Sequence, residues 1–143
     1  MIILDTNVIS EVMRPQPNVQ VMSWLREYPV EELAVTAVSI AEISYGLNRL
    51  AKGRRRDSLQ WRFQMFIAQG FSDRIFPFDD RAARIYADIV VNRQQQGKPI
   101  EVMDAMIAAI ALIKIATLAT RNVSDFENCG LELINPWEIF SDI

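Results

Sequence analysis

The sequence predicts an α/β fold with a central, mainly parallel sheet, and the pattern of its apolar residues leads to this prediction. Short apolar runs rich in β-branched residues alternate with longer segments whose apolar residues recur every three or four positions. Such alternation of strands and helices is typical of a parallel sheet covered by helices. Half of the 143 residues are apolar, which is enough for one continuous core, so we expect a single domain over residues 1–143.

The first half of the chain supplies two predicted strands and several predicted helices. The first strand is short, apolar and buried, and it runs into a helix at a polar triplet. Later boundaries are marked by proline and glycine, which end helices. The predicted segments are a strand over 2–4, a helix starting near Asp5-Thr6-Asn7, a helix over 18–28 closed by Pro29, a strand over 33–36, an amphipathic helix over 38–52 ended by Gly53, and a helix from Arg54 onward.

The second half continues the alternation. One of its helices is apolar nearly all round and is therefore expected at the centre of the molecule. The predicted segments are a strand over 74–78, a helix over 80–96, a turn at Gly97-Lys98-Pro99, the apolar helix over 101–115, and strands over 116–120 and 131–134.

The chain has no histidine and one cysteine, and both facts exclude classes of enzyme. Without histidine it lacks the usual general base near neutral pH, which excludes serine–histidine triads, zinc proteases of the two-histidine type and histidine-driven RNA cleavage. Hydrolysis must then rely on carboxylates, acting directly or by holding a metal ion. Cys129 has no second cysteine for an internal disulfide, and we expect a reduced cytosolic thiol.

Charge and hydropathy predict neither a membrane protein nor a strong overall attraction to nucleic acid. The formal net charge is −3 and the sequence pI is about 5.0, so contact with nucleic acid requires a local basic patch. The most apolar stretch, residues 105–113, is too short to span a bilayer, and the first residues lack the basic start and long apolar run of a signal peptide. We expect a soluble, cytoplasmic protein without membrane contact.

Two acidic residues near predicted strand ends each have two interpretations. Asp5 stands where a parallel strand ends, at the edge of an open α/β sheet where ligands bind, but aspartate is also a preferred helix cap. Glu42 follows Ser39 by three residues, which is the spacing of a capping box, although Thr36 competes with Ser39 for the cap. On this spacing alone, a capping role explains Glu42 better than metal binding.

Asp104 carries the strongest signal that comes from the residues alone. It lies in the first turn of the apolar helix, where the helix dipole favours an acid. Because the rest of that helix is apolar, we expect the carboxylate to be buried and to need hydrogen bonds or a cation. Asn122 and Asp125 follow the strand over 116–120 and are three residues apart, so one helical turn puts both on the same face, unless they serve only as turn residues.

Four short motifs occur in a specific order along the chain. They are Ile-Leu-Asp5-Thr6-Asn7, Ser39-Ile-Ala-Glu42-Ile, Met103-Asp104-Ala-Met-Ile-Ala-Ala and Ala119-Thr120-Arg121-Asn122-Val-Ser-Asp125-Phe126. In this order and spacing they resemble the PIN domain, and more narrowly the VapC or FitB-like toxins of type II toxin–antitoxin systems. The closing Asn135-Pro136-Trp137 fits the same subgroup, so the similarity covers residues 1–137.

The resemblance implies a three-layer α/β/α fold and an endoribonuclease that cleaves single-stranded RNA with Mg²⁺ or Mn²⁺. Carried over by position, Asp5, Glu42 and Asp104 match the three principal acids that hold the metal. Many members have a fourth acid where this chain has Asn122, which puts a second metal in doubt, and Asp125 is the candidate to replace that acid. The resemblance also implies a homodimer and a cognate antitoxin that silences the toxin.

The residue types agree with this chemistry. Hard divalent cations prefer oxygen ligands, and a bound cation lowers the pKa of a water molecule, so histidine is not required. Thr6 and Thr120 are candidates to orient the carboxylates or water, or are ordinary caps.

RNA binding requires basic side chains, because phosphate contacts dominate its affinity. Aromatic side chains can stack on bases, but at helical spacing they usually lie in the core. The best basic candidates are Arg54, Arg55 and Arg56 with Lys52, and this cluster is equally well explained as a solvated helix start. Arg49 and Arg121 are additional basic candidates. The aromatic candidates are Trp24, Trp61 and Trp137.

Two other functions remain open at this point. A phosphatase with an aspartyl nucleophile after the first strand generally needs a second acid two residues later, where this chain has Asn7. A catalytically inactive PIN-like interaction module is compatible with the missing acid at Asn122. Cleavage of RNA with Mg²⁺, Mn²⁺ or EDTA separates the nuclease from both.

Overall fold

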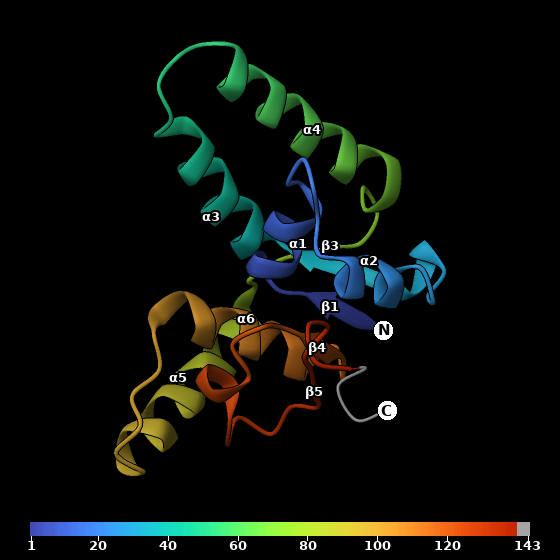
Figure 1. Cartoon of the computed structure of the whole chain (residues 1–143). Helices are drawn as coiled ribbons and strands as arrows, with labels where there is room; N and C mark the ends of the chain where they lie inside the picture. The colour runs from blue at the N-terminus through green and yellow to red at the C-terminus, as the bar shows by residue number, and fades with distance from the viewer. Residues whose placement is uncertain (140–143) are drawn as a thin grey trace.

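A parallel sheet between two layers of helices forms the centre of the molecule (Figure 1). The computed structural model describes residues 1–139. Within that range all strand pairs are parallel, in the spatial order β3-β2-β1-β4-β5. This confirms the predicted parallel α/β fold. The strands are β1 (Ile2–Leu4), β2 (Leu33–Thr36), β3 (Ile75–Phe76), β4 (Thr117–Ala119) and β5 (Leu133–Ile134).

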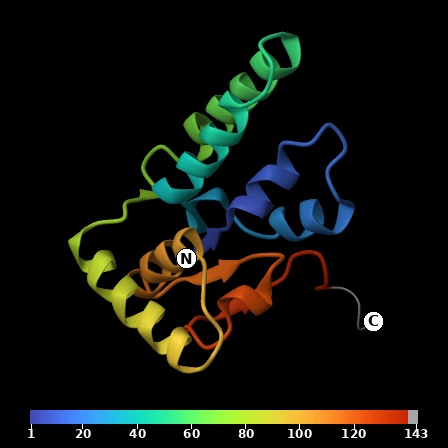
Figure 2. The same cartoon turned by 90° about the vertical axis from the view of Figure 1, so that its left-hand side faces the viewer.

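Four helices lie on one side of the sheet and two on the other (Figures 1 and 2). The α3–α4 pair extends beyond the sheet, as both views show. The first group is α1 (Thr6–Val12), α2 (Val19–Leu25), α3 (Ala37–Asn48) and α4 (Arg54–Gly70); the second is α5 (Asp80–Gln95) and α6 (Val102–Ile113); two short 3-10 helices, η1 (Val30–Glu32) and η2 (Val123–Phe126), complete the described chain.

Alternation along β1 explains the three layers. Successive side chains of a strand point to opposite faces. Ile2 and Leu4 pack with α1, α2 and α3, whereas Ile3 packs with α5 and α6. Both faces of the sheet are therefore buried against helices, as parallel sheets require. Among residues 1–139, no helix has the length and apolar character needed to cross a membrane.

The order of the strands creates a crevice between β1 and β4. The chain runs from β1 outward to β2 and β3, then returns to place β4 on the other side of β1. In open parallel sheets, ligands bind beyond the carboxyl ends of the strands where the order reverses in this way. Asp5 directly follows β1 and Thr120 directly follows β4. The backbone N–H of Asp5 donates to Ala119 O at 2.9 Å, which fixes the two strand ends side by side.

Two helix ends show how local chemistry shifts a predicted boundary. α3 ends at Asn48 instead of reaching Lys52, and Gly53 begins α4 instead of ending α3. Asn48 and Arg49 are exposed at this end of α3, and Gly53 is the N-cap of α4. At the end of α5, Gly97 forms the predicted turn with φ 72°.

Candidate active site

Asp5 is both a helix cap and a buried acid of the crevice. Its Oδ1 accepts the Thr6 backbone N–H at 2.8 Å, as expected of a cap on α1. Its Oδ2 accepts a hydrogen bond from Thr120 Oγ1 at 2.8 Å. The side chain is 4% exposed, and this burial raises the pKa of the carboxyl above its ordinary value, although both hydrogen bonds act in the opposite direction. Asp5 is therefore both the cap of α1 and a buried carboxylate at the crevice.

Glu42 is not a helix cap, so the capping box predicted with Ser39 is wrong. Thr36 is the N-cap of α3, and its side chain accepts the Ser39 backbone N–H at 3.1 Å. The helix starts earlier than the capping box requires because β2 ends at Thr36. Glu42 lies beyond the first turn, where Thr6 Oγ1 donates to its Oε1 at 2.8 Å. Thr6 thus fixes Glu42 on α3 relative to the start of α1.

Asp104 lies in the first turn of α6, as predicted, and is half-buried. Its pKa is raised to about 7, first by burial and then by the negative charges of Asp5, Asp125, Glu101 and Glu42. No ion pair formed by residues 1–139 includes Asp104 or Asp5. No paired basic side chain therefore neutralises these two carboxylates, which favours a bound cation.

The three principal acids converge on one hollow. Asp5, Glu42 and Asp104 all line a space of 490 Å³ at the carboxyl ends of the strands. Asn122 lines the same hollow, whereas Asp125 lines a separate cavity of 80 Å³ on the other side of Asp104. Asn122 directly precedes η2, and the Asp125 backbone N–H donates to Asn122 O at 3.0 Å, so both residues belong to one turn after β4.

The donor set fits a hard divalent cation held largely by water. Among residues 1–139, no three acidic, histidine or cysteine side chains are placed to hold one ion jointly by direct bonds. Mg²⁺ usually keeps several waters and takes one or two carboxylates. Asp5 and Asp104 can supply those two carboxylates, and Glu42, which lines the same hollow, can accept a hydrogen bond from a bound water.

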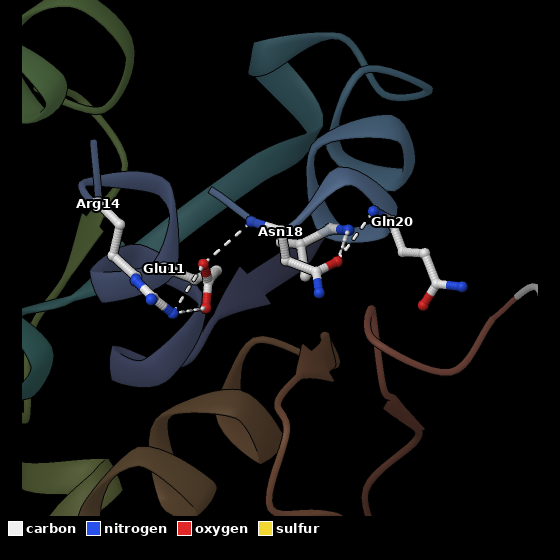
Figure 3. Close-up of polar contacts among 5 residues, drawn as sticks. Glu11, Arg14, Asn18 and Gln20 are labelled. Carbon is white, nitrogen blue, oxygen red and sulfur yellow. Dashed lines mark hydrogen bonds and ion pairs between the residues drawn. The ribbon is translucent and has the colours of Figure 1, made fainter. Parts of the chain in front are cut away.

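A further buried acid that lines the hollow, Glu11, was missed by sequence analysis (Figure 3). Glu11 is 6% exposed and accepts hydrogen bonds from the Asn18 backbone N–H at 3.0 Å and from Arg14 Nη1 at 3.3 Å. The Asn18 side chain in turn caps α2. Glu11 thus anchors the turn between α1 and α2 and holds Arg14, which lines the hollow. The three-residue spacing of Glu11 and Arg14 was the available sequence signal.

The predicted RNA-binding residues are not all near the acids. Arg121 lines the acidic hollow and lies over the Trp137 ring at 5.1 Å. Arg55 lines a neighbouring groove of 540 Å³ that shares Thr6 and Glu42 with the hollow. Neither space is lined by Arg54, Arg56, Lys52 or Arg49.

The other aromatic candidates divide between core and surface. Trp24 is 1% exposed and belongs to the core. Trp61, on α4, is 62% exposed, so the expectation that it is buried is wrong.

Comparison with known proteins agrees with this arrangement. A family model for the PIN domain matches residues 2–129. The relative named VapC ribonuclease Y4jK, from Sinorhizobium fredii, is 40% identical over 96% of this chain and 99% of its own length. Toxin FitB from Neisseria gonorrhoeae is 40% identical over the same shares of the two chains. The crystal structure of FitAcB from Neisseria gonorrhoeae has a TM-score of 0.91 and 40% identity, covering 97% of this chain and 100% of that one. The likeness extends over nearly the whole sequence and fold, and the chain therefore belongs to the PIN domain family.

Proposed function

We propose that this protein is a metal-dependent endoribonuclease and the toxin of a toxin–antitoxin pair. The observation that carries the proposal is the convergence of Asp5, Glu42 and Asp104 on one hollow without a neutralising ion pair. The relatives named VapC ribonuclease and Toxin FitB support the same function. The substrate we propose is single-stranded RNA, and the metal is Mg²⁺ or Mn²⁺.

Each acid has a distinct role in this proposal. Asp5 and Asp104 would hold the cation, and Asp104, whose pKa is raised to about 7 in the metal-free protein, would lose its proton on binding it. Thr6 engages one oxygen of Glu42, which leaves the other to orient a water molecule. When bound, the divalent cation lowers the pKa of water and neutralises charge on the phosphate. Asp125 shares a cavity with Asp104, its negative charge raises the pKa of both Asp5 and Asp104, and it takes the place of the acid missing at Asn122.

The RNA backbone meets basic side chains at the edge of the hollow. Arg121 lines the hollow beside Trp137, an arrangement that offers a phosphate contact next to an aromatic ring. Arg54, Arg55 and Arg56 at the start of α4 extend this contact, with Arg55 in the neighbouring groove.

The partners we propose are a cognate antitoxin and a second copy of the chain. The name of the relative Toxin FitB supports a toxin role, and such a toxin requires an inhibitor in the cell that makes it. In this proposal residues 1–143 form one nuclease domain that works in the cytoplasm.

Cleavage of single-stranded RNA by the purified protein tests the proposal. We expect cleavage with Mg²⁺ or Mn²⁺, none with EDTA, and none by Asp5→Asn, Glu42→Gln or Asp104→Asn. Asp88→Asn, an exposed acid of α5, is the matched control and should cleave normally. Near-wild-type cleavage by Asp104→Asn would refute the assigned site. A wild-type protein without cleavage would favour an inactive interaction module.

A further inference from the structure

A buried arginine, Arg93, lies beside the acidic site without a role in the chemistry proposed above. It is 5% exposed, and arginine is rarely buried without a carboxylate partner. None of the ion pairs formed by residues 1–139 includes Arg93. Groups other than a carboxylate must therefore satisfy the buried Arg93 guanidinium.

The Arg93 guanidinium binds backbone carbonyls of two separate segments. Nε donates to Lys98 O at 2.7 Å, and Nη1 donates to Asp125 O and Glu127 O, both at 2.9 Å. Lys98 belongs to the turn between α5 and α6, whereas Asp125 and Glu127 lie in η2 and directly after it. Arg93 thus ties the turn before α6 to the segment after β4.

The turn itself is held by the Arg93 backbone. Gly97 has φ 72°, and the Lys98 N–H donates to Arg93 O at 3.0 Å. This bond, together with that from the Gly97 N–H to Gln94 O, ends α5 as a Schellman motif. Both the main chain and the side chain of Arg93 are therefore hydrogen-bonded to the same residue, Lys98.

Each of the two tied segments carries an acid of the site. Asp104 lies in the first turn of α6, and Asp125 lies in η2. Both carboxylates and Arg93 line one cavity of 80 Å³. The hydrogen bonds of Arg93 therefore help to set the distance between Asp104 and Asp125.

We infer that Arg93 is a positioning residue that fixes Asp125 relative to Asp104 and thereby raises the affinity of the acidic site for a divalent cation. This inference rests on the proposed metal site. Arg93 acts through backbone carbonyls and does not itself line the hollow that holds Asp5, Glu42 and Asp104. Loss of groups that orient metal ligands typically weakens metal binding by about 10–100-fold.

Arg74 offers a matched control at the opposite edge of the sheet. Its side chain is 14% exposed, and it also binds backbone carbonyls: Nε donates to Leu33 O at 2.7 Å and Nη2 to Val30 O at 3.0 Å. Leu33 begins β2, so this arginine lies at the amino ends of the strands, away from Asp5. Its replacement should reduce stability without an effect on metal binding.

The experiment measures Mn²⁺ binding by titration calorimetry, without RNA, and melting in EDTA. The proteins are the wild type, Asp5→Asn, Arg93→Lys and Arg74→Lys. Lysine keeps the positive charge but cannot reproduce the planar set of N–H donors by which the guanidinium binds several carbonyls at once. We expect both lysine variants to melt earlier, and only Arg93→Lys to bind Mn²⁺ about tenfold more weakly or worse. Asp125→Asn should weaken Mn²⁺ binding in the wild type but add little in Arg93→Lys.

Several outcomes would overturn the inference. One is an Arg93→Lys protein that binds Mn²⁺ as tightly as the wild type. Another is an Arg93→Lys protein without a cooperative melting transition, which would assign Arg93 to folding alone. Equal loss of Mn²⁺ affinity in Arg74→Lys would also overturn it. If the wild type binds no Mn²⁺, or if Asp5→Asn binds it unchanged, the proposed function itself fails, so the two failures are distinguishable.

Discussion

At the scale of single residues, hydroxyl groups rather than basic side chains hold Asp5 and Glu42 in place. Thr120 is fully buried, donates to Asp5 Oδ2, and accepts the Asn122 backbone N–H at 3.1 Å. At the start of α1, the Thr6 hydroxyl likewise donates a hydrogen bond to the Glu42 carboxylate. Hydroxyl groups orient a carboxylate without neutralising it. The site therefore keeps the negative charge that a cation needs.

Sequence analysis identified these acids by two different routes. Burial predicted from the apolar helix singled out Asp104. A capping role explained Asp5 equally well and Glu42 better than metal binding, until the order of the motifs was considered. Spacing alone misassigned Glu42, because the end of β2, and not the Ser39–Glu42 interval, decides where α3 starts. Arg93 left no local signal, since its partners are carbonyls up to 34 residues away.

We predict that Asp104 makes the stability of the metal-free protein depend on pH. Its folded pKa of about 7 exceeds its ordinary value of 3.8, so the folded chain keeps a proton that the unfolded chain loses. Stability in EDTA should therefore fall as pH rises from about 4 to about 7 and change little above that. Asp104→Asn should make this slope shallower, leaving the part due to the raised pKa of Asp5, and gain on the order of 1–2 kcal/mol at pH 8, since solvent screening reduces the effect at a half-buried site.

Thermal melting in EDTA from pH 4 to pH 8 measures this difference. Asp88→Asn, on the exposed face of α5, should follow the wild-type curve. Parallel curves for the wild type and Asp104→Asn would show that Asp104 titrates normally.

At the scale of elements, periodicity predicted which segments form helices and strands but not where each one ends. The strands are shorter than predicted where tertiary pairing stops: the segment over 74–78 contributes only Ile75–Phe76, and that over 131–134 only Leu133–Ile134. Pairing depends on neighbouring strands far away in the sequence, which apolar periodicity does not describe. The 3-10 helix η2 was not predicted because its four residues, Val123–Phe126, are too few to show a periodic apolar pattern.

The cap of α3 supplies a prediction at this scale. Thr36→Val removes the oxygen that accepts the Ser39 N–H and should destabilise the protein by about 0.5–2 kcal/mol, whereas Thr36→Ser should keep most of the stability. Glu42→Gln should melt near the wild-type temperature but lose RNA cleavage, because Glu42 serves the site and not the cap. Denaturant unfolding and cleavage assays on the three variants measure both effects. A larger stability loss in Glu42→Gln than in Thr36→Val would restore the capping box.

At the scale of the whole molecule, the topology of the sheet gathers residues that lie far apart in the sequence. Asp5 and Thr120 meet because β1 and β4 are neighbours at the point where the strand order reverses. Glu42 and Asp104 join them from helices on opposite sides of the sheet. Such convergence cannot be read from any single motif, and only the resemblance of the four motifs together predicted it.

The charge distribution over the molecule yields a prediction about salt. The protein is acidic overall, so binding to RNA depends on local basic groups. Replacing Arg54, Arg55 and Arg56 together by alanine should weaken RNA binding and flatten its dependence on salt concentration, since fewer counterions are released. Fluorescence anisotropy of a labelled single strand between low and high salt measures the slope, using Asp104→Asn as background to prevent cleavage. An unchanged slope would assign these arginines to a solvated helix start.

The response of global stability to metal separates a convergent metal site from a set of helix caps. A cation that binds only the folded state stabilises it by about 2.7 kcal/mol at one hundred times its dissociation constant, or roughly 5–15 °C in melting temperature at this chain length. We therefore expect Mn²⁺ to raise the melting temperature of the wild type at pH 8. In Asp104→Asn, the temperature in EDTA should be equal or higher, because one of several repelling charges is gone, and the rise with Mn²⁺ should shrink. If Asp104 served only the dipole of α6, its loss should instead destabilise the metal-free protein and leave the metal response intact. Melting curves of both proteins in EDTA and in millimolar Mn²⁺ distinguish the two, and a destabilised variant with the full metal response would refute the convergent site.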